Sequence, residues 1–118
     1  MKSARLLLEQ IEQAAETARA HLAGLTREQF LNDKKTQDAV CYALIGLGEA
    51  AKNLSAGFRE AHPEIPWGEA VKMRDYLAHG YTTVEPDILW DTVQRDIEPL
   101  VREVRRIRAQ AGETQEHE

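Results

Sequence analysis

Three side chains that can do acid–base or phosphate chemistry lie together near the middle of the chain: Arg74, Asp75 and His79. They belong to the stretch 67–81, which reads WGEAVKMRDYLAHGY. On a helix, Asp75 and His79 face each other because they are four residues apart. A carboxylate beside an imidazole fixes which ring nitrogen carries the proton, and such a pair suits a general acid or base near neutral pH. Arg74 can add a fork of N–H donors for a phosphate group.

This set of groups suits the cleavage of a phosphodiester bond. RNA carries its own nucleophile, the 2′-hydroxyl, so an enzyme needs only proton transfer and stabilisation of the developing charge. The residues therefore indicate a ribonuclease that needs no metal ion. His21, His62 and His117 are scattered without the spacing of metal ligands, so we expect no metal site and no cofactor.

The same residues also have a purely structural interpretation. A protonated His79 in the last turn of a helix interacts favourably with the helix dipole. Arg74 and Asp75 can be ordinary surface charges, and a lone Tyr81 is more often a packing residue than a functional one. Spacing alone leaves catalysis and surface charge both open.

Length and composition are those of one globular domain, with 118 residues and a net charge of -5. The single Cys41 lies in an apolar run, so we expect a buried thiol and a reducing compartment. Glu9 and Glu12 interrupt any signal peptide, and the weakly polar run 39–48 is too short to cross a bilayer. We therefore expect a cytoplasmic protein without membrane contact, whose acidic surface does not bind nucleic acid indiscriminately.

Apolar residues repeat at helical spacing along almost the whole chain. Short connections between long amphipathic helices predict an all-α, up-and-down antiparallel bundle of four main helices plus a short helical turn. Pro99 should kink the last helix. We assign residues 1–110 to the bundle and 111–118 to a flexible acidic tail. The expected helices are 2–22, the short turn 27–31, 35–58, 67–80 and 86–109.

The helix expected at 35–58 has an unusual outer face, opposite its apolar stripe. Tyr42, Gly46, Glu49 and Asn53 share this face, with Gly48 at its flank. A glycine inside a helix costs about 1 kcal/mol relative to alanine, so retained glycines indicate close contact with another backbone. We predict that a second helix packs there, in the same chain or across a homodimer interface.

Four segments, in the same order along the chain, resemble the HepT-like toxins of the HEPN superfamily. RDYLAHGY at 74–81 is similar to their signature, in which four residues, the first of them polar, separate Arg from His, and Tyr follows two residues after the His. LGEAAKNLS at 47–55 is similar to their pattern Ile-Gly-Glu-Ala-x-Lys-x-Leu-Ser. The segments 65–67 and 84–90 also match, and the resemblance covers roughly residues 3 to 108.

The resemblance implies a homodimeric HEPN-like bundle in which two copies of Arg74 and His79 meet at a cleft along the interface. It implies a metal-independent endoribonuclease that acts on tRNA or mRNA and leaves a 2′,3′-cyclic phosphate and a 5′-hydroxyl. His79 would be the general base or acid, Arg74 would stabilise the pentavalent phosphorane, and Asp75 would orient the site. Supporting or interface roles fall to Glu49, Lys52 and Lys72.

The resemblance also implies a partner, a small MNT-type nucleotidyltransferase that acts as antitoxin in a type VII-like toxin–antitoxin system. In the family this partner transfers AMP to the tyrosine of the motif, here Tyr81, where bulk and negative charge beside Arg74 would block RNA entry. Asp75 stands where related toxins often have Asn, so its charge could slow cleavage or make His79 a better base. Two other hypotheses remain: a non-catalytic bundle that docks a nucleotidyltransferase and binds nucleotide, and a structural dimer with a solvated polar patch.

Overall fold

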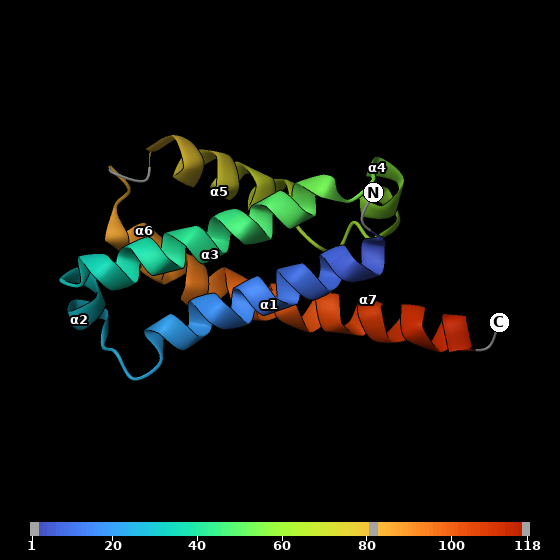
Figure 1. Cartoon of the computed structure of the whole chain (residues 1–118), viewed down its shortest axis with the longest axis horizontal. Coiled ribbons are helices and arrows are strands. Elements are labelled where there is room, and N and C mark those ends of the chain that lie inside the picture. The colour runs from blue at the N-terminus through green and yellow to red at the C-terminus, as the bar shows by residue number, and fades with distance from the viewer. Residues whose placement is uncertain (1–2, 81–82, 117–118) are drawn as a thin grey trace.

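The computed structural model describes residues 3–80 and 83–116, which form helices joined by short connections and contain no strand (Figure 1). The all-α class and the up-and-down order of the long helices are therefore as expected. The helices are α1 (Ala4–Leu22), α2 (Arg27–Leu31), α3 (Lys34–Asn53), α4 (Ala56–Ala61), α5 (Trp67–Gly80), α6 (Pro86–Asp91), the π-helical η1 (Thr92–Ile97) and α7 (Glu98–Glu116).

Side-chain caps set the starts of the early helices. Ser3 accepts a hydrogen bond from the backbone N–H of Leu6 at 3.2 Å and starts α1. Thr26 and Gln29 cap each other's backbone N–H at 3.1 and 2.9 Å, which confirms the short turn at α2. Asp33 does the same for α3, where it accepts from the backbone of Thr36.

The helix predicted over 35–58 is two helices, so that prediction was wrong at its second half. The chain leaves the helical conformation at Leu54, with φ -67° and ψ 142°. Ser55 then caps α4, because its hydroxyl accepts from the N–H of Phe58 at 3.0 Å. Burial of the Leu54 side chain, which is 2% exposed, holds the corner in place.

The last helical rod, made of α6, η1 and α7, differs in form and length from the single helix expected at 86–109. Where the sequence predicts a kink at Pro99, the structure has a π-helical segment, η1, that ends two residues before this proline. Within it, the hydroxyl of Thr92 donates to the carbonyl of Ile88 at 2.8 Å. The rod continues to Glu116 rather than ending near Ala109, since Ala, Gln and Glu favour helix and Gly112 costs only about 1 kcal/mol.

The core lies where α1, α3 and the last rod meet. The largest fully buried side chains come from six different helices: Leu7, Leu8, Ile11, Phe30, Val40, Leu77, Leu89, Val101 and Val104. Cys41 is buried as expected, and desolvation raises the pKa of its thiol. Among the described elements, α5 packs mainly against α3, so it forms an outer helix at one edge of the bundle (Figure 1).

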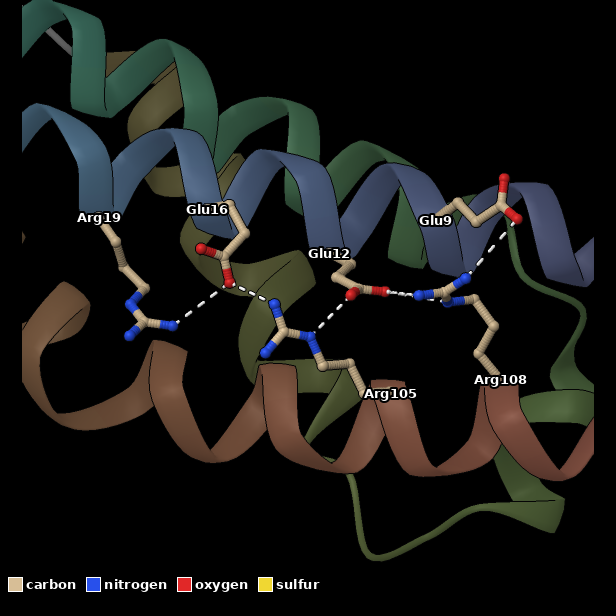
Figure 2. Close-up of polar contacts among 6 residues, drawn as sticks. All are labelled: Glu9, Glu12, Glu16, Arg19, Arg105 and Arg108. Atoms are coloured by element: carbon tan, nitrogen blue, oxygen red, sulfur yellow. Dashed lines mark hydrogen bonds and ion pairs between the residues drawn. The ribbon is translucent and has the colours of Figure 1, made fainter.

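An ion-pair ladder fastens α7 to α1 (Figure 2). Glu12 is its centre: the carboxylate accepts from Arg105 Nε at 2.7 Å and from Arg108 at 2.8 Å. Its side chain is only 14% exposed, so these contacts are partly shielded from solvent. The remaining members are Glu9, Glu16 and Arg19.

None of the helices in the described ranges is long and apolar enough to cross a membrane.

Candidate active site

The site is built where α5 crosses closest to α3, at Gly48. A Cβ added to Gly48 would overlap the Cβ of Arg74 and lie 2.7 Å from the carbonyl oxygen of Ala70. The predicted close backbone contact therefore exists, and at Gly48 its partner is α5 of the same chain. Gly46 is different, because an added Cβ there would meet no atom within 4 Å.

Arg74 extends from this crossing between two carboxylates. Its NH1 donates to Asp75 Oδ1 at 2.8 Å, and its NH2 lies 2.8 Å from Glu49 Oε2 on α3. The hydrogen bond to Asp75, followed by the charge of Glu49, raises the pKa of Arg74 further. In return, the hydrogen bond from Arg74 is the main cause that lowers the pKa of Asp75, and the charge of Lys52 acts in the same direction.

His79 lies exposed in the last turn of α5. Its Nδ1 is 2.8 Å from the backbone carbonyl oxygen of Asp75. Because a carbonyl oxygen can only accept, we assign the ring proton to Nδ1, which leaves Nε2 of the neutral ring as an exposed acceptor. The backbone carbonyl of Asp75 contacts the ring, whereas its carboxylate binds Arg74 and interacts with His79 through its charge.

The other predicted site residues divide into two groups. Glu49 and Lys52 lie beside the Arg74–Asp75 pair, as the ion pair and the pKa of Asp75 show. Lys72 points elsewhere: it is strongly exposed and its ion-pair partner is Glu69, at 3.9 Å. Tyr81 lies outside the described residues.

Gly80 ends α5, as the sequence predicts. Its carbonyl oxygen accepts two hydrogen bonds from Thr83, one from the backbone N–H at 2.8 Å and one from the hydroxyl at 3.1 Å. These contacts close the helix one residue after His79.

A second feature of α5 was not predicted. An apolar groove of about 430 Å³ separates α5 from η1 and α7. Ala70, Met73 and Leu77 share one apolar face of α5 at helical spacing, but Ala70 and Met73 line this groove and are only half-buried, whereas Leu77 is fully buried. Periodicity identifies an apolar face but cannot tell whether a neighbouring helix covers all of it.

Within residues 3–80 and 83–116, no group of three or more His, Cys, Asp or Glu side chains could hold a metal ion. The candidate site thus consists of a guanidinium held by carboxylates and an imidazole with a free Nε2, on one helix of an all-helical bundle. A guanidinium can bind a phosphate and an imidazole can transfer a proton, so these groups can support cleavage of an RNA phosphodiester bond.

The comparison with known proteins agrees with this class. The family described as Ribonuclease HepT-like matches residues 11–107. A probable ribonuclease HepT of Thermococcus cleftensis is 45% identical over 101 residues, which cover 86% of this chain and 92% of that protein. A putative RNase of Caldanaerobacter subterraneus is 38% identical over 107 residues, or 91% of this chain and 96% of that protein. No solved structure matches the chain.

The chain therefore belongs to the HepT-like ribonuclease family. This membership confirms the resemblance, the HEPN-like fold and the enzyme class, an endoribonuclease.

Proposed function

We propose that this protein is a metal-independent endoribonuclease toxin that uses the 2′-hydroxyl of RNA as nucleophile, with His79 and Arg74 as its catalytic residues. The observation that carries the proposal is the bond between His79 Nδ1 and the backbone carbonyl of Asp75. It leaves Nε2 exposed and able to accept a proton. The guanidinium of Arg74, which can bind phosphate, belongs to the same helix five residues before His79.

In the reaction, His79 Nε2 takes the proton of the 2′-hydroxyl, and the 2′-oxygen attacks the adjacent phosphorus. Arg74 donates to the non-bridging oxygens and stabilises the charge of the phosphorane. The bond from phosphorus to the 5′-oxygen then breaks, and that oxygen takes a proton from a protonated imidazole acting as general acid. The products are a 2′,3′-cyclic phosphate and a 5′-hydroxyl. Asp75, predicted as a catalytic residue, acts through Arg74.

The test is cleavage of tRNA and mRNA in EDTA by the parent and by His79→Ala and Arg74→Ala. Loss of a positioned acid–base group typically lowers the rate by about 10² to 10⁴, and we expect losses of that size. His21→Ala and Arg102→Ala are matched controls, since both residues are exposed and lie on other helices. Equal cleavage by parent and site variants would indicate a contaminating nuclease. No cleavage by any protein would favour the non-catalytic docking role.

We further propose a homodimer that joins two such sites, so that the His79 of the second protomer, in its protonated form, can donate a proton to the 5′-oxygen. The outer face of α3 supports this, because the Tyr42 side chain is 82% exposed and Gly46, four residues on, has open space above it. Tyr42→Arg should shift the mass measured by light scattering toward the monomer. Ile88→Arg, at an exposed apolar residue of α6, should not. A parent that is monomeric at the concentrations that cleave RNA would contradict the dimer.

The proposed partner is a nucleotidyltransferase antitoxin of the MNT type in a type VII-like system. It would transfer AMP from ATP to the phenolic oxygen of Tyr81, with release of pyrophosphate. Support comes from position: Tyr81 follows His79 by two residues, so a phosphate there adds negative charge next to the site. Co-expression with the neighbouring nucleotidyltransferase should add AMP-sized increments to the intact mass, and Tyr81→Phe should abolish them. An unchanged mass of the parent would contradict this regulation.

A further inference from the structure

We infer that Glu49 is a positioning residue for cleavage, which holds the Arg74 guanidinium in a fixed orientation relative to α3. This inference rests on the proposed function, because it concerns the arginine of that site. Its basis is the contact of 2.8 Å between Arg74 NH2 and Glu49 Oε2, which joins α5 to α3.

The donors of Arg74 show why Glu49 matters. Nε is buried and has no hydrogen-bond partner in the described part of the chain, so NH1 and NH2 alone orient the guanidinium. The partner of NH1 is Asp75, the next residue on the same helix, which moves with α5. Of the side chains in residues 3–80 and 83–116, Glu49 alone ties the guanidinium to another helix. A guanidinium has two N–H groups on each terminal nitrogen, so one on each stays available for a phosphate.

Gly48, next to Glu49, fixes the Arg74 side chain at its base, near the Cβ atom. The absence of a Cβ lets the Arg74 stem lie directly against the α3 backbone. Arg74 is thus held near its Cβ by Gly48 and at its tip by Glu49, and its side chain is only 24% exposed. Two consecutive residues of α3 therefore determine where the guanidinium points.

Charge predicts how the loss of Glu49 would appear in kinetics. Asp75 and Glu49 both face Arg74, so the cluster already holds two carboxylates that oppose the binding of an RNA phosphate. Removing one negative charge should leave KM unchanged or lower it. A displaced guanidinium should instead lower kcat, since a 1 Å misplacement can cost up to about 100-fold.

The experiment compares Glu49→Gln and Glu49→Asp by steady-state cleavage of one RNA in EDTA. Gln keeps the length and an acceptor oxygen but loses the charge, whereas Asp keeps the charge and is one methylene too short. We expect Glu49→Asp to lower kcat by about 10-fold or more without raising KM, and Glu49→Gln to stay within about 3-fold of the parent. Glu60→Asp, at an exposed residue of α4, is the control.

Thermal unfolding of each variant separates positioning from folding. A half-exposed ion pair contributes little to stability, so all three proteins should unfold close to the parent. A parental kcat in Glu49→Asp, equal losses in Asp and Gln, or a raised KM at unchanged kcat would each overturn the inference. If Arg74→Ala and His79→Ala also cleave normally, the proposed function itself has failed. If only those two lose activity, the positioning role of Glu49 alone is wrong.

Discussion

Two groups of Asp75 serve two different partners. The backbone carbonyl contacts His79 Nδ1, and the carboxylate contacts Arg74 NH1. Replacing the carboxylate by an amide would therefore keep the hydrogen bond that sets the imidazole tautomer, while it removes a negative charge that acts on Arg74, Lys52 and His79. This division also explains how Asn can stand at this position in related toxins, since its amide oxygen can still accept from NH1.

The Asp75–Arg74 pair should make stability depend on pH. The pKa of Asp75 is lowered from 3.8 in the folded protein, chiefly by the hydrogen bond from Arg74. A carboxylate with a lowered pKa in the folded state stabilises the fold fully at pH values above its pKa in the unfolded chain. This stabilisation is lost as the pH falls through the folded-state pKa. The melting temperature of the parent should exceed that of Asp75→Asn at pH 7, and the difference should shrink toward pH 3. A difference that is constant or grows on acidification would contradict the ion pair.

At the scale of helices, the crossing of α3 and α5 creates the site. Arg74 and His79 are on one helix, but the orientation of Arg74 comes from Gly48 and Glu49 on the other. α5 packs mainly against α3, so little else in the described structure can compensate if this crossing changes.

The two glycines of α3 provide a matched pair of variants. Gly48→Ala should destabilise the fold by about 1–3 kcal/mol, because its Cβ would press on Arg74 and Ala70 and push the helices apart. It should also reduce cleavage, since Arg74 moves. Gly46→Ala should stabilise the helix by up to about 1 kcal/mol, because nothing lies within 4 Å of the added methyl. Denaturant unfolding measures both, and a destabilisation at Gly46 equal to that at Gly48 would refute the crossing.

Sequence patterns predict the helices well where local chemistry decides them. The capping box at Thr26 and Gln29 and the stop at Gly80 are local, and both are present. The break at Leu54 is not visible in the periodicity, because apolar residues keep helical spacing before Leu54 and after it, as far as Phe58. The Ser55 cap is the local signal that could have revealed it.

The candidate site was predictable as a set of residues but not as a set of contacts. Asp75 and His79 are four residues apart on a helix and are therefore neighbours, whichever group of Asp75 makes the contact. Whether the carboxylate binds His79 or Arg74 depends on where α3 places Gly48 and Glu49, which is a tertiary property. Spacing within one helix cannot contain that information.

At the scale of the whole molecule, the bundle is held at its two edges in different ways. On one edge the ion-pair ladder joins α7 to α1 (Figure 2). On the other edge, α5 lies beside an apolar groove and is held by its buried Trp67 and Leu77, by the close contact at Gly48 and by the ion pair to Glu49. The helix that carries the chemistry thus depends mainly on one neighbour, α3.

The ladder should contribute to stability mainly through its shielded centre. Glu12→Gln should lower the free energy of unfolding by about 1 kcal/mol, the order expected for partly shielded charged hydrogen bonds. Glu9→Gln is the matched control, since Glu9 is more exposed and lies 3.9 Å from Arg108. Its effect should be near zero. Urea unfolding at 0.1 M and 1 M salt should show the Glu12 effect decreasing with salt. Equal effects of the two variants would contradict a shielded centre.

The central claim is that the protein cleaves RNA through the 2′-hydroxyl without a metal. The most direct measurement uses an RNA that the parent cuts at a mapped site, and the same RNA with a single 2′-deoxynucleotide on the 5′ side of that bond, both in EDTA. We predict cleavage of the first RNA to a 2′,3′-cyclic phosphate and no cleavage of the second at that bond. Cleavage of the deoxy-substituted bond, or a need for added metal ions, would contradict the account.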